Sequence, residues 1–524
     1  MSFAKEHSIN RNLIKNHMIK LDLDNPKKDY DQLIEAIGNA QVVLIGEASH
    51  GTEEFYHERC LITKRLIEEK DFTVVACEAD WPDTYKVNRY VQNFKLNNSK
   101  DAHEALSDFK RFPTWMWRNH QISDFVEWLK KRNDELEAKA RAEQGEEEWN
   151  RYNKTGIYGL DLYSLFASIE AVITYLESVD ARAAKKARQA YGCFDHFDRS
   201  TESYAFSTYF KVSSSCEKEV IRVLTDLAKK QSEQITHKNH SNEEEVDELF
   251  CAKINAMVVK DSEEYYQFVL SLKGKMINGG AQSWNMRDSH MMELLKALIN
   301  YFQRQRTKQV KAVVWAHNSH IGDARQTHQG ERQKELNIGQ LAREQFGIER
   351  VYNIGFTTHT GTGNINTQKV FLLQVYSQNT DNRNAIVTAA SNWNGPREKK
   401  KVNPSRPETV EHLFHTVAEE TSSPNFLLNF NQIQQNKKLA VSKDLITELA
   451  HKARLKERAI GVIYRPDTEL QSHYFNAKVS LQFDAVIHID TTSALKPLPD
   501  KTEDEIDRTN MKEEELPTTF PTGE

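Results

Sequence analysis

Short apolar runs recur along the chain, and longer segments of mixed polarity separate them. The runs are rich in Val and Ile; they cover residues 41–48, 73–79, 156–163, 311–318, 350–357, 369–376, 425–430, 459–464 and 484–490. Continuous apolarity is typical of strands covered on both faces, as in a parallel sheet. Segments 53–70, 164–179 and 284–305 space their apolar residues by about 3.6, which predicts helices. Together these patterns indicate an α/β fold with a mostly parallel sheet flanked by helices.

One long segment departs from this alternation, because residues 164–305 show amphipathic helix patterns and no convincing strand. The polar stretch 229–248 predicts a mobile loop within it, and the charged segment 131–150 predicts an exposed helix. The large helical insertion is expected to form part of the cleft. The expected domains are residues 1–163 (first part of the α/β core, with N-terminal helices), 164–305 (helical insertion), 306–498 (second part of the core) and 499–524 (acidic, disordered tail).

Composition narrows the class of protein. Of 524 residues, 39% are hydrophobic and 28% charged, which fits a large globular enzyme. The net charge of −6 and the lack of a long Lys/Arg stripe speak against nucleic acid binding, and the basic run 397–401 is expected to be a solvated loop. Neither a signal peptide nor a membrane span is recognisable, so we expect a cytoplasmic protein without a membrane partner. The oligomeric state does not follow from the sequence.

The five cysteines are scattered and form no CxxC pair, which fits neither a disulfide framework nor a zinc ribbon. We expect most of them in the core. Cys77 lies inside an apolar run beside Glu78, so a catalytic thiol is conceivable, but a buried inert thiol is the more common situation.

Ionisable side chains follow four of the predicted strands. Glu47, Glu78, Asp161 and His317 each come at the end of an apolar run. Ligands of open parallel sheets bind outside the carboxyl ends of the strands, so the four residues are expected to line one crevice. Any one of them could also simply mark where a strand leaves the core.

The loop after the first run is the most informative. Gly46 and Gly51 flank Glu47 and His50 just before a predicted helix, and glycines permit a tight turn there. A position near a helix start favours the neutral imidazole, which predicts that His50, in an exposed loop, acts as a base. His317 and His320 follow another strand and could face the same crevice.

Several common catalytic motifs are missing. No GxSxG elbow, Walker A loop or HExxH helix occurs in the chain, so an activated water explains hydrolysis better than a serine nucleophile. Two His with nearby Glu could also hold zinc, which remains a second hypothesis. No cofactor is expected.

Aromatic residues cluster at 111–119, where Trp115 and Trp117 flank Met116. Such a stripe is usually core. With Pro113 and two Arg beside it, it could instead form a cleft wall that binds a bulky organic substrate.

Long motifs in a fixed order then resemble the erythromycin esterase family. They are GEASHGTEEFY, CEADWPD, FPTWMWRN, GLDLYS, NMRD, WAHNSHIGDAR, IGQL, GFTTHTGT, RAIGVIYRPDTELQSHYF and FDAVIHID, and they cover nearly the whole chain apart from the tail and the polar loops.

The resemblance implies metal-independent hydrolysis of an ester on an α/β core. The ester could be a macrolide lactone, and its hydrolysis would then confer antibiotic resistance. By motif position, His50 resembles the general base of the family. Glu47, Glu78, His317 and His320 resemble its essential site residues, and Arg59 resembles a supporting charge. The substrate does not follow from membership. The alternatives are a metal-dependent hydrolase that uses the same cleft and a binding protein for haem or metal without turnover.

Overall fold

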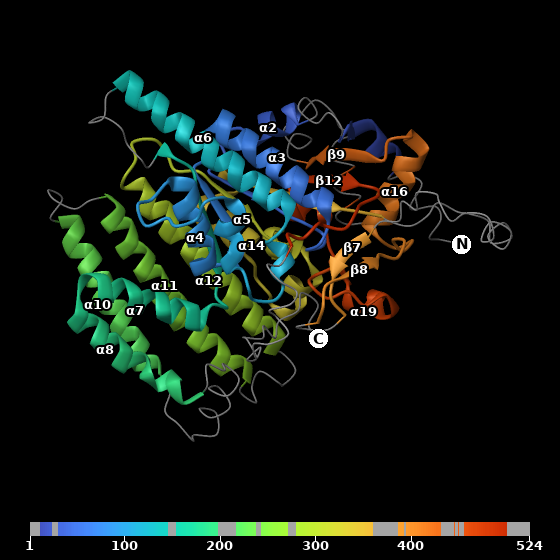
Figure 1. Cartoon of the computed structure of the whole chain (residues 1–524). Helices are drawn as coiled ribbons and strands as arrows, with labels where there is room; N and C mark the ends of the chain where they lie inside the picture. Colours follow the sequence, from blue (N-terminus) through green and yellow to red (C-terminus); the bar gives the residue numbers. More distant parts are fainter. Residues whose placement is uncertain are drawn as a thin grey trace. The chain divides into compact units, whose positions relative to one another are not determined.

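The computed structural model describes residues 11–23, 30–144, 153–197, 216–236, 243–270, 279–359, 386–391, 395–430, 445, 449 and 455–499. They fold into two compact units. Unit 1 comprises Met1–Lys70, Ala316–Lys334 and Ala342–Pro497, and unit 2 comprises Asp71–Trp315, Glu335–Leu341 and Leu498–Glu524. Unit 1 therefore joins the N-terminal elements, blue in Figure 1, to the C-terminal ones in orange and red.

The sheet of unit 1 has the strand order β1-β9-β12-β6-β2. The strands are β1 (Ile19–Lys20), β2 (Val42–Ile45), β6 (Val351–Thr357), β9 (Asn425–Asn429) and β12 (Ala485–Ile489). β6 pairs in parallel with β2 and β12, whereas β9 pairs antiparallel with β12 and β1. β2, β6 and β12 are buried throughout, as their apolar sequences predict.

Helices and two small ladders complete unit 1. The helices are α2 (Asp31–Ile37), α3 (Glu53–Lys70), α13 (Asn318–Ile321), α16 (Val410–Thr421), α19 (Glu469–Ser472) and α20 (Val479–Gln482), with α14 (Ile338–Phe346) shared between the units. The ladders are antiparallel: β7 (Ile386–Ala389) with β8 (Glu398–Lys401), and β10 (Lys456–Arg458) with β11 (Tyr474–Asn476). Short helical turns lie at Ala324–Gln326, Gln329–Gln333, Ile348–Arg350 and Pro466–Thr468.

Unit 2 has the parallel strand order β5-β3-β4, formed by Ala312–Trp315, Val74–Asp80 and Gly156–Asp161. Its helices are α4 (Trp81–Gln92), α5 (Ala102–Ala105), α6 (His120–Gln144), α7 (Leu165–Val179), α8 (Ala181–Tyr191), α10 (Glu217–Thr236), α11 (Glu243–Leu270) and α12 (Gly279–Gln303). Short turns lie at Leu106–Asp108, Thr114–Met116 and Gly192–Phe197.

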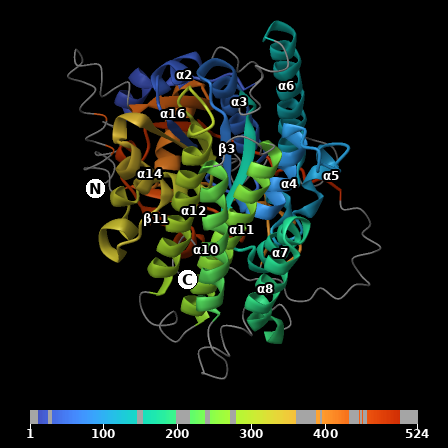
Figure 2. The ribbon, with the colours of Figure 1, turned by 90° about the vertical axis from the view of Figure 1, so that its left-hand side faces the viewer.

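Four of these helices share a core of their own. α7, α8, α10 and α11 pack around buried side chains that include Leu176, Val220 and Leu249, and they appear in green in Figures 1 and 2. α8 begins at Asp180, whose carboxylate accepts hydrogen bonds from the backbone N–H groups of Arg182 and Ala183. Amphipathic spacing in residues 164–305 thus folds into helices in the part that the structure describes.

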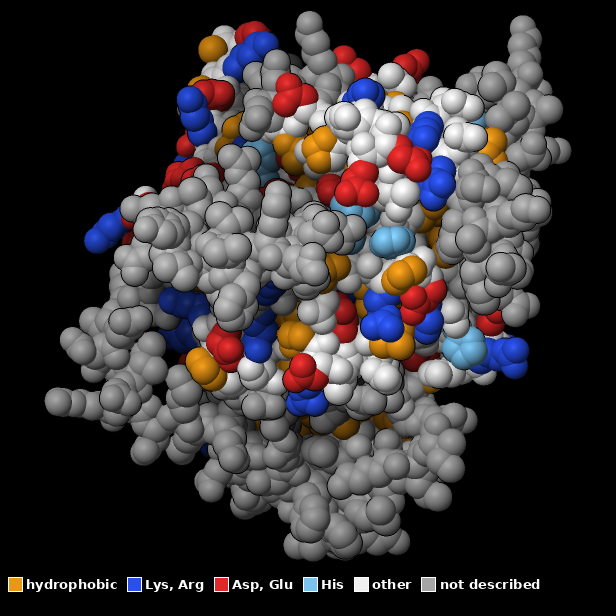
Figure 3. All heavy atoms as spheres, turned by 90° about the vertical axis from the view of Figure 1, so that its right-hand side faces the viewer, with side chains coloured by type: hydrophobic (Ala, Val, Ile, Leu, Met, Phe, Trp, Pro, Cys, Tyr) orange, Lys and Arg blue, Asp and Glu red, His pale blue; other side chains and the backbone are white. Residues whose placement is uncertain are grey.

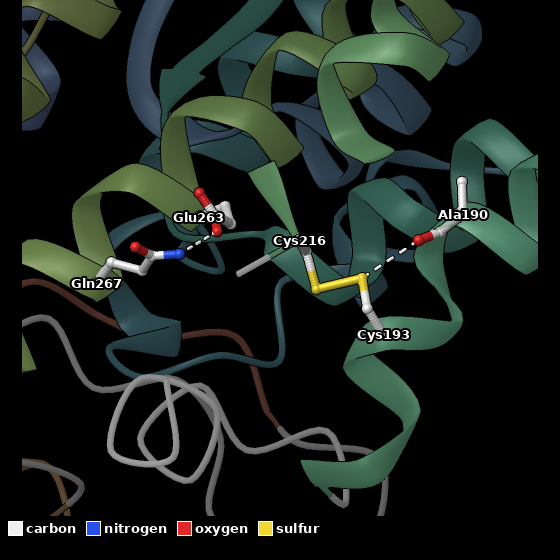
Figure 4. Close-up of a disulfide and its surroundings, with 5 residues drawn as sticks. All are labelled: Ala190, Cys193, Cys216, Glu263 and Gln267. Carbon is white, nitrogen blue, oxygen red and sulfur yellow. Dashed lines mark hydrogen bonds between the residues drawn. A yellow bond between two sulfur atoms is a disulfide. The ribbon is translucent and has the colours of Figure 1, made fainter. Parts of the chain in front are cut away.

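A disulfide links the turn after α8 to the start of α10. Cys193, in the turn after α8, is bonded to Cys216, the residue before α10; Figure 4 shows the bond with its surroundings, including Glu263 and Gln267 of α11. The free cysteines Cys60, Cys77 and Cys251 are buried. The cysteine count alone did not predict the disulfide, because residues 23 positions apart in sequence can be bonded only if the fold brings them together.

The predicted α/β class, with a mostly parallel sheet flanked by helices, is confirmed. Three local predictions are wrong. Residues 459–464 form no strand, since Ile460 and Ile463 make only isolated bridges, to Ser49 and Ala390. The basic run at 397–401 is not a loop, because β8 pairs with β7; Lys399 and Lys401 are exposed, and Lys400 is partly buried.

The third wrong prediction is the extent of the loop at 229–248, of which residues 237–242 lie outside the described residues. α10 continues to Thr236 and α11 begins at Glu243, so the polar residues there belong largely to helices. The predicted exposed helix at 131–150 forms the end of α6 as far as Gln144. The strand predicted at 369–376 and residues 500–524 of the acidic tail lie outside the described residues. The predicted domain boundaries stay predictions.

The described surface carries charges of both signs, which agrees with the modest net charge. On the face seen in Figure 3, basic and acidic side chains lie close to one another over the described part, together with several histidines. Among the described helices, none is both long enough and apolar enough to cross a lipid bilayer.

Candidate active site

The loop between β2 and α3 carries the first group of candidate residues. Its backbone is held by Ile460, which donates to Ala48 O (2.9 Å) and accepts from His50 N (3.3 Å). The carbonyl of Gly51 accepts from the N–H groups of Thr388 and Leu495. A Cβ on Gly51 would lie 1.8 Å from the carbonyl oxygen of Thr388, so only glycine fits. The loop is therefore fixed by its packing.

Glu47 and His50 form a buried pair in this loop. His50 Nδ1 lies 3.0 Å from Glu47 Oε1, and both residues are less than a tenth exposed. Burial alone would raise the pKa of Glu47, but the charge of Arg59 and the hydrogen bond of His50 outweigh it and lower the pKa. An ionised Glu47 accepts a hydrogen bond from Nδ1–H, which leaves Nε2 of the uncharged imidazole as an acceptor.

Arg59 and Tyr56, both on α3, contact the Glu47–His50 pair. Arg59 is fully buried, with Nη1 3.4 Å from Glu47 Oε1 and its guanidinium 4.4 Å from the centroid of the Tyr56 ring. The Tyr56 hydroxyl donates to the carbonyl of His50 (2.9 Å). The sequence did not single out Tyr56, although it lies within the motif GEASHGTEEFY, as the fourth residue of α3.

His317 lies beside His50, with ring centroids 4.9 Å apart. It caps α13, and its Nδ1 accepts from the backbone N–H of Ser319 (3.2 Å). A ring nitrogen that accepts from a backbone amide carries no proton, so the neutral ring of His317 has its proton on Nε2. His320, also on α13, is buried three residues further on.

One expectation about this group is wrong. His50 was expected in an exposed loop, but it is only 6% exposed, because the segments around Thr388, Ile460 and Leu495 pack against the loop.

Unit 2 holds the second group, Glu78 and Asp161, at the carboxyl ends of β3 and β4. Arg287 on α12 donates to both oxygens of Asp161 (Nε 3.0 Å, Nη2 2.7 Å) and to Glu78 (2.7 Å). Burial alone would raise the pKa of Asp161, but Arg287 outweighs it and lowers the pKa. Within unit 2 the two carboxylates therefore converge on one guanidinium. A single crevice that contains both groups stays a prediction.

Two arginines of unit 2 flank Tyr163. The guanidinium groups of Arg111 and Arg287 each lie 5.0 Å from the centroid of its ring. Arg111 also donates to both carboxylate oxygens of Asp80, the last residue of β3. The sequence analysis did not select Arg287 and Arg111 as site candidates. Arg287 lies in the motif NMRD and Arg111 directly precedes FPTWMWRN, but neither residue follows a predicted strand.

Trp115 and Trp117 are buried in unit 2. Trp115 packs edge-on against Phe112, with centroids 5.3 Å apart, and Trp117 lies 6.3 Å from Phe109. These contacts are typical of aromatic packing in a core. Substrate contact by either ring stays a prediction.

Comparison with known proteins identifies the family. The family model described as erythromycin esterase matches residues 67–492. The chain belongs to the erythromycin esterase family. A curated relative, the erythromycin esterase type II of Escherichia coli, is 22% identical over 360 residues, which are 66% of this chain and 77% of the relative.

Solved structures show the same fold. A succinoglycan biosynthesis protein has a TM-score of 0.64 and 20% identity, and it matches 94% of this chain and 98% of its own. A protein from Bacillus cereus has a TM-score of 0.63 and 16% identity, with 94% and 99% covered. A mutant of the erythromycin esterase EreC in its open conformation has a TM-score of 0.57 and 14% identity, with 90% and 97% covered.

Membership of the erythromycin esterase family supports an esterase-like hydrolase that acts on a small molecule. Among the residues that the structure describes, no group of three or more His, Cys, Asp or Glu side chains is arranged to hold a metal ion.

Proposed function

We propose that this chain hydrolyses carboxylic esters with a water molecule activated by His50, without a metal ion. The observation that carries the proposal is the buried Glu47–His50 hydrogen bond of 3.0 Å, with the His317 ring beside it. A carboxylate that fixes an imidazole through Nδ1 leaves Nε2 to remove a proton, which is the arrangement of a general base.

In the proposed mechanism, His50 Nε2 removes a proton from water while the water oxygen attacks the ester carbonyl carbon. The carbonyl oxygen becomes an oxyanion and accepts a hydrogen bond from His317 Nε2–H. The intermediate then breaks its bond to the alkoxide, which takes the proton from His50 and leaves as an alcohol. Arg59 acts through Glu47, because its charge keeps that buried carboxylate ionised.

The substrate class is proposed from the relatives. The Escherichia coli relative is named an erythromycin esterase, so a macrolide lactone is the first ester to test, together with simple esters. Glu78, Asp161, His320, Trp115 and Trp117 are proposed to line or support the substrate site, and the proposed place of action is the cytoplasm.

The test compares hydrolysis of macrolides and simple esters by the wild type and His50→Gln. Loss of a general base costs roughly a hundred- to ten-thousand-fold in rate, so His50→Gln should be nearly inactive. Glutamine fills most of the space of the ring, which keeps the loop packed. The matched control is His57→Gln, since His57 is an exposed histidine on α3 whose side chain pairs with Glu58. Activity retained in His50→Gln would rule out His50 as the base.

A further inference from the structure

Asn318 lies where two strands of unit 1 separate. β2 and β6 pair in parallel as far as Ile45 and Ile354, and the N–H of Gly46 still donates to Ile354 O (2.8 Å). Beyond this point Asn318 lies between the strands. Its backbone N–H donates to Glu47 O (2.9 Å), while its side chain both donates to Phe356 O (2.7 Å) and accepts from Phe356 N (3.2 Å). One residue thus replaces the next rung of the ladder.

The side chain of Asn318 fits closely against Gly46. Asn318 is fully buried, and a Cβ on Gly46 would lie 2.1 Å from its Oδ1. A side chain at position 46 would therefore displace the amide. This contact requires glycine at position 46, a requirement that the turn alone would not explain.

A buried carboxyl group fixes the amide from the other side. Asn318 Nδ2 also lies 3.3 Å from Oε1 of Glu457, which is fully buried on β10. Burial, together with the charge of Glu411, raises the pKa of Glu457 to about 8. The neutral carboxyl group offers an acceptor to Asn318 without placing a full charge beside the site. All the contacts of the amide thus agree on one orientation.

We propose that Asn318 is a positioning residue that sets the distance between the Glu47–His50 pair and His317. This inference rests on the proposed function. Asn318 directly follows His317 in the chain and holds the carbonyl of Glu47, so a shift of Asn318 moves both sides of the site. A misplacement of about 1 Å can reduce the rate about a hundredfold while ground-state binding hardly changes.

The kinetic test uses Asn318→Ala and, as a matched control, Asn429→Ala. Asn429 is a buried asparagine on β9 of the same sheet, and its side chain accepts from the hydroxyl of Tyr352 (3.0 Å). Both variants lose buried hydrogen bonds, but only Asn318→Ala should lower kcat, by about 10- to 100-fold, with KM within about twofold. Asn318→Leu should not restore kcat, because leucine has a similar size but can neither donate to Phe356 O nor accept from Phe356 N. Gly46→Ala should lower kcat like Asn318→Ala.

A second readout needs no turnover. In protein labelled with ¹³C at its histidines, the ring signals of His50 and His317 should shift in Asn318→Ala and stay in place in Asn429→Ala. Equal kcat values for the two variants, with unchanged His317 signals, would overturn the inference. If the signals shift as expected but the wild type hydrolyses no ester, the positioning role stands and the proposed function fails.

Discussion

His50 and His317 use the same ring nitrogen in opposite ways. Nδ1 of His50 faces the carboxylate of Glu47 and donates, whereas Nδ1 of His317 faces the backbone N–H of Ser319 and accepts. The Nε2 atoms therefore differ: one can remove a proton and the other can donate a hydrogen bond. The proposed hydrolysis needs both an acceptor and a donor, and two rings with the same tautomer would not supply them.

The sequence suggested these residues, and His50 as a base, but it could not give the tautomers of the two rings. Glu47 and His317 were found because they follow apolar strands, and His50 was found because it lies between two glycines just before a predicted helix. The tautomers of the two histidine rings depend on contacts such as the N–H of Ser319. The contact that requires glycine at position 46 is made by Asn318, which lies 272 positions further along the chain. Arg287 was missed because a helix interior gives no comparable signal.

The first prediction in this section concerns Arg287. Arg287→Lys keeps the charge but loses the planar fork that binds both oxygens of Asp161 and reaches Glu78. Because the carboxylates are buried, the variant should lower the free energy of unfolding by about 1–3 kcal/mol, measured by urea denaturation.

Arg188→Lys is the matched control. Arg188 pairs with Glu177 at the surface, where both side chains are about half exposed, so its unfolding midpoint should not change. Equal midpoints for the two lysine variants would show that the buried fork contributes no more than a surface pair.

At the scale of elements, the sequence predicted what burial determines. The apolar runs at 41–48, 73–79 and 350–357 became buried strands, and the 3.6-residue period at 53–70 matches α3. Prediction failed where a segment is buried without forming a strand, or forms a strand without being buried. Ile460, Ile463 and Tyr464 are buried without forming a ladder, whereas the lysine-rich β8 forms one although three of its four residues are exposed. Apolar pattern reports burial, not hydrogen bonding.

A cluster of histidines, formed by His359 just after β6, His415 in the middle of α16 and His488 within β12, predicts a dependence of stability on pH. The rings of His359 and His415 stack with centroids 3.4 Å apart, and His415 and His488 both contact Asp490. Burial, with the charges of His415 and Arg458 adding to it, lowers the pKa of His359 to about 3; burial likewise lowers the pKa of His473 to about 4 and also lowers that of His488. The hydrogen bond to Asp490 raises the pKa of His415 despite its burial.

The signs of these shifts give the direction. A histidine with a lowered pKa stays neutral in the fold and takes up a proton on unfolding, so its contribution to stability is lost as pH falls from about 6.5 towards the folded pKa. His415 acts in the opposite sense. The thermal midpoint of the wild type should therefore fall relative to that of His359→Gln between pH 7 and pH 5, because the variant lacks this buried imidazole. An unchanged pH dependence in the variant would contradict this role for His359.

The disulfide makes a separate prediction for the helices of unit 2. A bond that closes a loop of 23 residues stabilises by about 3 kcal/mol in the chain-entropy description. The double variant Cys193→Ser, Cys216→Ser should therefore unfold at a lower temperature than the oxidised wild type. Reduced wild type should match the double variant, and reductant should not affect the variant. A wild type whose midpoint ignores reductant would contradict the prediction.

At the scale of the whole molecule, each unit is assembled from segments far apart in the sequence. Unit 1 joins residues near position 47 to residues near 318 and 457, and unit 2 joins residues near 78, 161 and 287. Local pattern could place each segment on a strand or helix, but only the topology decides which segments meet.

The last prediction concerns metal and tests the whole mechanism. If His50 activates water through Nε2, with Glu47 bound to its Nδ1, hydrolysis needs no Lewis acid. Protein stripped of metal by prolonged chelation, with removal verified by elemental analysis, should then hydrolyse the ester at the rate of the untreated sample. The decisive comparison is activity, since two Glu and two His could bind a divalent cation without using it. A loss that zinc or manganese reverses would instead mean that a metal ion sets the acidity of the attacking water.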